Sequence, residues 1–376
     1  MEQFDVPTSH PVEQNARLNP IVPAPGLRIV TTGAARIFTL DRPQARNALD
    51  NNLKAALSTA IPKSARDADI YAIILRSSRP GVFCAGGDVR ELASLAASDP
   101  AAAARALAAE YTLVWLLECF SKPVVALMDG TVMGGGAGIT QVNTHKVAAE
   151  TYGFAMPEVH LGFLPDDGVA HALGRLPGAI GEYLALTGRR IGRADAYALG
   201  LVTHCIDAAH FDHIERGLAD AQPVDPLLDA LHRDPGAAEI AAARPLIDKC
   251  FGGASIEDIV ARLRTESGAW AAGAIADIER ASPLALKVAM RHVRQSRALD
   301  LRQTLSLDYR LGVRMMAAHD FREGVRASLI DKDHTPRWLP RATTEISDAF
   351  IDDLFKPSPA SFLNLPTRQE MQAARI

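Results

Sequence analysis

Two glycine-rich stretches, Phe83–Asp88 (FCAGGD) and Met133–Gly138 (MGGGAG), decide how this chain folds. Each follows an apolar run typical of a β-strand and precedes a run typical of a helix. The first N–H groups of a helix have no partner within it, so such turns leave backbone donors free. Glycine also lets a ligand approach that backbone closely. Two such turns that meet at one point predict an oxyanion hole, a site for an oxygen that becomes negative during a reaction.

Other templates for glycine-rich turns fit less well. No Gly-x-x-x-x-Gly-Lys stretch occurs, which excludes a P-loop. Ile139 stands where a dinucleotide-binding fingerprint that began at Gly134 needs glycine. The absence of a Gly-x-Ser-x-Gly elbow removes support for a serine hydrolase of the usual α/β kind. Cys84 is expected to be a buried structural thiol, because a nucleophilic cysteine needs a basic partner.

The composition is that of an ordinary globular enzyme. The chain has 376 residues, of which 48% are hydrophobic and 22% charged, with a net charge of −4. This charge does not support binding to nucleic acids or to anionic membranes. No stretch is apolar enough to span a bilayer, and the first residues lack the layout of a signal peptide. The four widely spaced cysteines predict a reduced, cytoplasmic protein without a metal site.

Strand-like and helix-like runs alternate along the first part of the chain, which indicates an α/β fold. Strands are expected over 28–40 as a hairpin, 70–76, 123–128 and 146–149, and helices over 47–61 and 101–119. The stretch Asp220–Gly236 is expected to be a connector, and Ser282-Pro283 to start a helix. The predicted regions are a flexible arm (1–26), a core (27–220), a helical region (221–340) and a tail (341–376).

Four acidic residues are candidates for site chemistry. Glu158 follows an apolar strand, and a carboxylate among apolar neighbours tends to have a raised pKa. Two carboxylates beside one cavity can divide the roles of base, nucleophile and positioning group. Asp166 can either cap the next helix or point into such a cavity. Asp167 is expected to cap that helix or to face solvent, and Glu110, judged locally, to be a solvated side chain.

Taken together, these stretches resemble the crotonase superfamily of enoyl-CoA hydratases and isomerases. The matching pieces occur in the family's order and spacing, and they are Leu40–Leu49, Phe83–Asp88, Asp129–Gly136 and Phe154–Glu158. The resemblance covers residues 28–340. Within the superfamily the chain is most similar to the 3-hydroxyisobutyryl-CoA hydrolase branch. That similarity rests on Cys84–Arg90, on Glu158 with Asp166 eight residues later, and on Asp320–Asp333.

The resemblance implies the crotonase (ClpP-like) fold, a spiral of ββα units followed by a helical C-terminal region. It implies hydrolysis of a short hydroxyacyl-CoA thioester, as in valine breakdown, to a free acid and CoA. CoA is then part of the substrate, and no other cofactor is expected. The crotonase relatives often form trimers or hexamers, so a homo-oligomer is an open option.

The resemblance also implies a role for individual residues. The thioester oxygen would lie between the N–H groups of Gly87 and Gly135. The catalytic carboxylates would be Glu158 and Asp166. The residues implied to bind the substrate are Glu110, Gly135, Glu158 and Asp166. The residues implied to line the CoA part are Arg46, Ala48, Ala85, Gly86 and Asp88.

The choice of reaction depends on Gly138. Hydratases of this family use two glutamates, and the second would fall at Gly138, which has no side chain. Hydrolysis is therefore favoured, with Glu158 either attacking the carbonyl carbon to give a mixed anhydride or acting as base on water. Asp166 would bind the substrate hydroxyl or orient the water. The alternatives are an enoyl-CoA isomerase that uses Glu158 alone and a non-catalytic acyl-CoA binder.

The chain departs from the hydrolase branch directly after Asp166. That branch usually continues with valine and a glycine-rich helix start, whereas here Asp167–His171 follows. The added charge and bulk are expected to change the acyl pocket and hence the substrate that it accepts.

Overall fold

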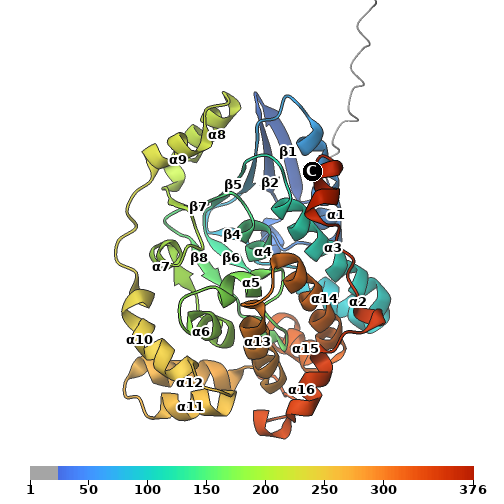
Figure 1. The fold of residues 1–376 in the computed structure, drawn as a ribbon, viewed down its shortest axis with the longest axis vertical. Helices are drawn as coiled ribbons and strands as arrows, with labels where there is room; N and C mark the ends of the chain where they lie inside the picture. Colours follow the sequence, from blue (N-terminus) through green and yellow to red (C-terminus); the bar gives the residue numbers. More distant parts are fainter. Residues whose placement is uncertain (1–23) are drawn as a thin grey trace, which may run out of the picture.

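The computed structural model describes residues 24–376, so almost all of the predicted N-terminal arm lies outside the described residues. Two sheets form the core of the fold (Figure 1). The larger sheet has the order β1 (Leu27–Thr32), β2 (Ala35–Leu40), β3 (Ala72–Ser77), β5 (Val124–Met128), β7 (His145–Ala148), β10 (His204–Cys205). The smaller sheet has the order β4 (Val82–Cys84), β6 (Thr131–Met133), β8 (Gly153–Ala155), β9 (Ile191–Gly192).

The chain alternates between the two sheets as it advances. β3, β5 and β7 are parallel neighbours in the larger sheet, and each is followed by a strand of the smaller sheet, β4, β6 or β8. This repetition confirms the predicted spiral of ββα units. Because β4 and β6 are adjacent and parallel, their carboxyl ends meet at one edge. The two glycine-rich turns begin at that edge, and the sheet therefore brings them side by side.

Helices follow the strand pairs of the spiral. They are α1 (Asn51–Arg66), α2 (Val89–Ser98), α3 (Pro100–Glu118), α4 (Gly135–Gln141), α5 (Val169–Gly174), α6 (Ile180–Thr187) and α7 (Arg193–Ala198). The α1 helix was expected to end near Pro62, but it continues for another turn. Burial of Ala65 against the core outweighs the hydrogen bond that Pro62 cannot donate. Asp50 caps its start by accepting a 2.8 Å hydrogen bond from the Leu53 N–H.

The rest of the described chain is helical. Its helices are α8 (Phe211–Ala219), α9 (Val224–Leu231), α10 (Glu239–Phe251), α11 (Ile256–Arg264), α12 (Ala269–Arg280), α13 (Pro283–Ser296), α14 (Leu301–Ala317), α15 (His319–Val325), α16 (Asp348–Phe355) and α17 (Arg368–Ala373). The connector predicted for Asp220–Gly236 is wrong in part, because α9 forms there and buries Leu228. Ser282 caps α13 as predicted. The predicted region boundaries at 220 and 340 stay a prediction.

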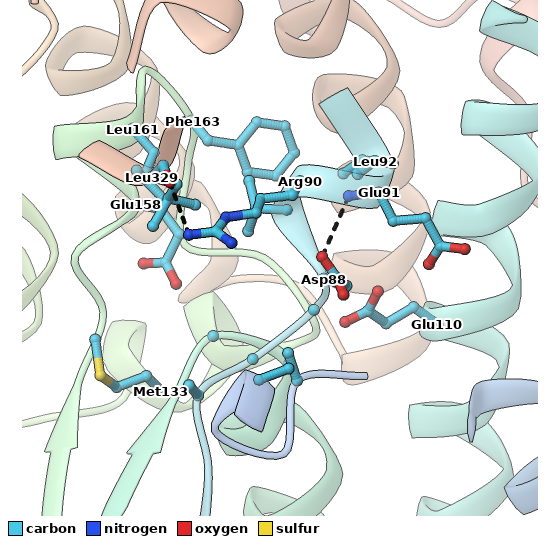
Figure 2. Close-up of a pocket in the computed structure, with 18 of the residues that line it drawn as sticks. Asp88, Arg90, Glu91, Leu92, Glu110, Met133, Glu158, Leu161, Phe163 and Leu329 are labelled. Atoms are coloured by element: carbon cyan, nitrogen blue, oxygen red, sulfur yellow. Dashed lines mark hydrogen bonds between the residues drawn. The ribbon is translucent and has the colours of Figure 1, made fainter. Parts of the chain in front are cut away.

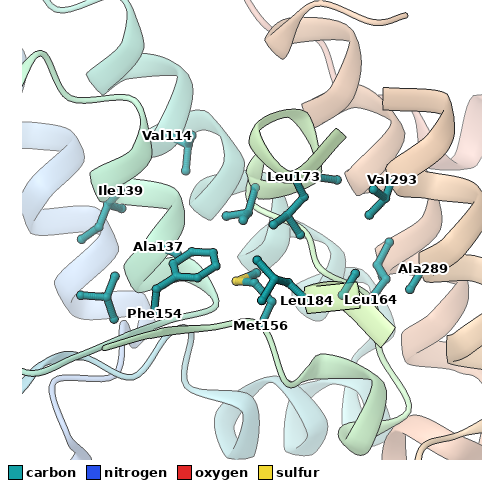
Figure 3. Close-up of a cluster of buried hydrophobic side chains, with 14 of the residues drawn as sticks. Val114, Ala137, Ile139, Phe154, Met156, Leu164, Leu173, Leu184, Ala289 and Val293 are labelled. Carbon is teal, nitrogen blue, oxygen red and sulfur yellow. The ribbon is translucent and has the colours of Figure 1, made fainter. Parts of the chain in front are cut away.

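One apolar cluster joins the spiral to the C-terminal helices. Figure 3 shows Phe154 of β8 and Ala137 of α4 in one group with Val293 of α13. Met156 and Leu164 belong to the same cluster, and both are fully buried. These two residues bracket the segment that carries Glu158, so core packing fixes the position of that segment.

Candidate active site

A cavity of about 900 Å³ opens where the two glycine turns meet. Its volume is in the range of cavities that bind small molecules and cofactors. The residues predicted for the site all line it, and they are Arg46, Ala48, Ala85, Gly86, Gly87, Asp88, Glu110, Gly135, Glu158 and Asp166. The structure therefore brings every predicted site residue to one cavity, although their roles stay predictions. In Figure 2, Glu158 and Glu110 approach the cavity from opposite sides.

The two turns pack backbone against backbone. A methyl group at Gly86 would lie 3.1 Å from the carbonyl oxygen of Met133 and 3.3 Å from the nitrogen of Gly135. Gly86 has a φ of +104°, which favours glycine there on conformational grounds as well. Among the described residues, neither the Gly87 nor the Gly135 N–H donates a hydrogen bond to another protein group. Two free donors on touching turns suit a negative oxygen.

Glu158 lies directly after β8, at the start of the 3-10 helix η2 (Glu158–Leu161). A side chain added at Gly134 would meet its Oε1 at 3.2 Å, so this carboxyl group stands over the second glycine turn. Its Oε2 is buried and has no hydrogen-bond partner among the described residues. Burial, and then the nearby charge of Asp166, raise the pKa of Glu158 well above its usual value. Once ionised, such a group is a strong base.

Asp166 faces the same cavity and is held by a tyrosine. The Tyr111 hydroxyl, fully buried on α3, donates a 2.6 Å hydrogen bond to Oδ2 of Asp166. Burial raises the pKa of Asp166, and this outweighs the lowering effect of the Tyr111 hydrogen bond. The raised pKa favours the protonated form of Asp166, and a protonated carboxyl group can donate a hydrogen bond to a substrate oxygen.

Glu110 is not the solvated side chain that its local sequence suggested. It is 5% exposed, and its Oε2 pairs with the Nζ of Lys54 at 3.1 Å. Helix α3 brings Glu110 to the first glycine turn, where a methyl group at Gly87 would lie 2.9 Å from its Oε1. Its place in the site is thus set by the packing of α3 against α1.

The expectation for Asp167 is wrong. Its side chain neither caps α5, whose N-cap is Gly168, nor faces solvent, since it is 3% exposed. A φ of +55° turns it toward the second glycine turn, where a methyl group at Gly135 would lie 3.1 Å from its Oδ2. Oδ1 has no hydrogen-bond partner among the described residues. Burial and the charges of Glu110 and Asp166 raise its pKa well above the usual value.

Asp167→Asn is expected to stabilise the protein more at pH 8 than at pH 4. The folded-state pKa of Asp167 is raised, so its carboxyl group favours folding below its unfolded pKa and loses that contribution as pH rises through the folded pKa. Asparagine does not titrate and tolerates a positive φ. Urea unfolding of both proteins at the two pH values measures this. An equal difference in unfolding free energy at both pH values would contradict the assignment.

Two buried residues of the C-terminal helices hold the Asp166–Gly168 loop in place. The Gly168 N–H donates a 2.7 Å hydrogen bond to Oδ2 of Asp308 on α14. The other oxygen of Asp308 lies 2.5 Å from Nε2 of His292 on α13. Both side chains are completely buried. The C-terminal helices therefore fix the loop that carries two of the site's carboxyl groups.

Asp308→Ala is expected to destabilise the fold by about 3–5 kcal/mol, because it leaves buried polar groups of Gly168 and His292 without a partner. Chemical denaturation measures the loss. The matched control is Asp352→Ala, which removes a 58% exposed carboxylate paired with Arg291 and is expected to cost less than about 1 kcal/mol. Equal losses in the two variants would refute the anchoring role of Asp308.

Asp88, one of the residues predicted to line the CoA part, also stabilises the fold. Asp88 caps α2 and pairs with Arg42 at 2.7 Å. Burial acts to raise the pKa of Asp88, but the hydrogen bond from Arg42 holds it below the usual range. Figure 2 shows a second cross-connection, in which Arg90 donates to the carbonyl oxygen of Leu329 at 2.7 Å. This contact ties α2 to the π-helix η4 (Arg326–Ile330).

Cys84 behaves as the structural thiol that was expected. It is fully buried, and burial raises its pKa to about 12, far from that of a nucleophilic cysteine. Within residues 24–376 no group of three or more histidine, cysteine, aspartate or glutamate side chains is arranged to hold a metal ion. None of the helices in that range combines the length and apolar composition that a bilayer crossing needs.

Sequence reasoning missed Lys54, although a signal was present. Lys54, Leu57 and Ile61 recur at helical spacing, and the last two belong to the core. A lysine on a buried helix face is rare unless it is paired. The prediction for Asp167 was wrong for another reason, since no local pattern predicts the backbone conformation that turns it inward.

Comparisons with known proteins identify the family and the fold. Residues 35–355 match the family described as enoyl-CoA hydratase/isomerase. A mitochondrial 3-hydroxyisobutyryl-CoA hydrolase of Gallus gallus is 35% identical over 335 residues, which are 86% of this chain and 87% of that protein. The 3-hydroxyisobutyryl-CoA hydrolase 1 of Arabidopsis thaliana is 33% identical over 359 residues, which are 91% of this chain and 95% of that protein.

Two solved structures resemble the whole fold. A structure described as an enoyl-CoA hydratase from Rhodobacter sphaeroides has a TM-score of 0.86 at 31% identity, over 90% of this chain and 100% of that one. One described as a carnitinyl-CoA dehydratase from Mycobacterium thermoresistibile has a TM-score of 0.85 at 34% identity, over 89% and 98%.

Proposed function

Because the chain belongs to the enoyl-CoA hydratase/isomerase family, we propose that it is an acyl-CoA thioester hydrolase. Its substrate is a short hydroxyacyl-CoA similar to 3-hydroxyisobutyryl-CoA, and its products are the free acid and CoA. The named activities of the relatives from Gallus gallus and Arabidopsis thaliana support this choice. A role in valine breakdown is part of the same proposal.

One observation carries the choice of hydrolysis over hydration by two glutamates. A Cβ atom at Gly138 would lie 2.5 Å from the Cβ of Asp167 and 2.9 Å from its carbonyl oxygen. Real Cβ atoms do not approach other atoms that closely, so the backbone leaves no room for a glutamate at position 138. We therefore assign Glu158 and Asp166, of the carboxyl groups that line the cavity, to the thioester carbonyl.

In the proposed reaction the thioester oxygen accepts hydrogen bonds from the N–H groups of Gly87 and Gly135. A nucleophile then attacks the carbonyl carbon, and the oxygen becomes negative as the tetrahedral intermediate forms. The nucleophile is either water, which gives a proton to Glu158, or an oxygen of Glu158 itself. Collapse of the intermediate breaks the C–S bond, and the CoA sulfur leaves and takes up a proton. In the second route water hydrolyses the resulting anhydride.

Asp166 orients the substrate in this scheme. Its raised pKa favours the protonated form, which can donate to the substrate hydroxyl while Tyr111 holds the other oxygen. The two carboxyl groups differ in their partners, because Asp166 accepts from Tyr111 whereas Oε2 of Glu158 has no partner among the described residues. We therefore assign Glu158 as base or nucleophile and Asp166 as a hydrogen-bonding group.

Reversible hydration is a second candidate, favoured by Asp167. Its carboxyl group lies beside Gly138, next to where the second glutamate of a hydratase would begin. In this candidate Asp167 is the second acid–base group with Glu158. The descriptions of the two solved structures, a hydratase and a dehydratase, support it.

A free-thiol assay with a panel of short hydroxyacyl-CoAs tests the main proposal. CoA release from 3-hydroxyisobutyryl-CoA is the expected result. Parallel samples that contain short enoyl-CoAs are followed for loss of the double bond and for its migration. Release of no thiol from any ester would overturn the hydrolase proposal. Hydration without release would favour the second candidate, migration an isomerase, and tight binding without turnover a non-catalytic binder.

The compartment and the assembly stay predictions. All four cysteines are free thiols, which is consistent with the predicted cytoplasmic setting, although the relative from Gallus gallus is named as mitochondrial. A homo-oligomer remains an expectation from the family.

A further inference from the structure

Lys54 is the buried cation of the cavity. Its side chain lines the cavity and is only 4% exposed, whereas the arginines that line it, Arg42, Arg46 and Arg90, are partly or fully exposed. The Lys54 ammonium donates to Oε2 of Glu110 at 3.1 Å and to the carbonyl oxygen of Ala106 at 3.1 Å. The proposed reaction gives no task to this lysine.

The Glu110 carboxylate that Lys54 binds lies beside both glycines of the oxyanion hole. A methyl group at Gly87 would lie 2.9 Å from Oε1 of Glu110, and one at Gly135 would come closer still to the same oxygen. Oδ2 of Asp167 adjoins Gly135 as well, at 3.1 Å from that methyl position. Carboxyl oxygens thus lie beside both glycines of the proposed oxyanion hole.

A negative charge in this position works against the reaction. Like charges a few ångströms apart in a partly buried site repel strongly enough to change an equilibrium by about tenfold or more. The free N–H groups of Gly87 and Gly135 would then be opposed by Glu110. An ammonium on Glu110 cancels that repulsion without contacting the substrate oxygen.

We propose that Lys54 is a positioning residue that neutralises Glu110 and so preserves the preference of the oxyanion hole for a negative oxygen. The proposal rests on the role given above to Gly87 and Gly135. It concerns more than stability, because a buried ion pair by itself adds little to folding compared with an apolar pair. Lys54 acts on the oxyanion through Glu110.

The preference for a negative oxygen is measurable without turnover. The probe is acetoacetyl-CoA, whose enolate carries negative charge on the thioester oxygen. Binding of the enolate is followed by its near-ultraviolet absorbance. The absorbance change directly after mixing is used, before any hydrolysis of the probe. The neutral reference is S-butyl-CoA, a thioether that cannot be hydrolysed. The ratio of the two affinities removes any general loss of CoA binding.

Four variants set the net charge of the Lys54–Glu110 pair beside the proposed oxyanion hole to different values. Lys54→Met leaves one negative charge, and the ratio is expected to fall by about tenfold or more. Glu110→Gln leaves one positive charge, and the ratio is expected to rise above that of the wild type. The double variant removes both charges and is expected to return the ratio toward the wild-type value, while Lys54→Arg keeps it.

A structural role alone would lower the ratio in all four variants or leave it unchanged, and either result overturns the proposal. Absence of enolate binding by the wild type overturns it as well. The double variant contains no unpaired charge, so it guards against a Lys54→Met protein that fails to fold. If no thioester is hydrolysed but the affinity ratio changes among the four variants as expected, the role of Lys54 stands and the hydrolase proposal fails. If thioesters are hydrolysed but the ratio does not change in that way, only the role proposed for Lys54 is refuted.

Discussion

Glu158→Gln is expected to lower kcat for thioester hydrolysis by about 10²- to 10⁴-fold, with a much smaller change in KM. Glutamine keeps the shape of the side chain, but it can neither accept a proton from water nor attack a carbonyl carbon. The buried, unpartnered Oε2 of Glu158 makes this group available for that chemistry. Steady-state kinetics of CoA release measure the effect.

The matched control is Glu279→Gln. Its carboxylate is 59% exposed and pairs with Arg264 at 3.5 Å on the surface, so kcat is expected to stay at the wild-type level. Full hydrolysis by the Glu158→Gln protein would refute the role of this residue. Accumulation of a covalent acyl-enzyme in the wild type, detected by mass spectrometry after rapid quenching, would favour nucleophilic attack over base catalysis.

Gly135→Ala keeps the backbone N–H, but its methyl group disturbs the surroundings of this donor, and kcat is expected to fall by up to about 10²- to 10³-fold, the full effect of losing one donor. The added methyl group would collide with Oε1 of Glu110 and lie 3.1 Å from Oδ2 of Asp167. It would therefore displace the carboxyl groups beside the proposed oxyanion hole. Gly135 has an ordinary φ and begins a helix, so the backbone itself tolerates alanine.

Thermal unfolding distinguishes a local effect from a general one. The melting temperature of Gly135→Ala is expected to stay close to that of the wild type while kcat falls. Gly192→Ala is the control, because nothing lies within 4 Å of the added methyl group and its φ is −87°. Loss of activity in the Gly192 variant, or normal kcat in the Gly135 variant, would contradict the assignment of the oxyanion hole.

The cavity keeps several carboxyl groups buried, and two different contacts make this possible. Asp308 and His292 hold Gly168 in place, which keeps Asp166 and Asp167 inside the cavity despite their unfavourable burial. Lys54 offsets the negative charge of Glu110, a third carboxyl group of the cavity. Replacing Asp167 by asparagine is therefore expected to raise stability at neutral pH and to lower or alter activity, a trade-off that is common at active sites.

Some parts of the site were predictable from local sequence. The turns Phe83–Asp88 and Met133–Gly138 follow strands, and the order of those strands in the spiral brings the turns together. Glu158 follows β8 within the Phe154–Glu158 stretch, so its position depends on the same repeat. Even so, the predicted end of α1 at Pro62 was wrong, because packing against the core outweighed a local rule.

The sequence by itself determined the alternation of strands and helices, the two glycine turns that follow strands, and the place of Glu158 after a further strand. These follow from strand and turn chemistry, which acts between residues close in the chain, whereas the spiral was predicted from the resemblance to the crotonase superfamily. Only the tertiary structure decided that Lys54 pairs with Glu110, that Asp167 turns inward, and that Asp308 holds the loop from 140 residues away. Burial of a charge depends on what distant segments place around it, and no local pattern encodes those neighbours.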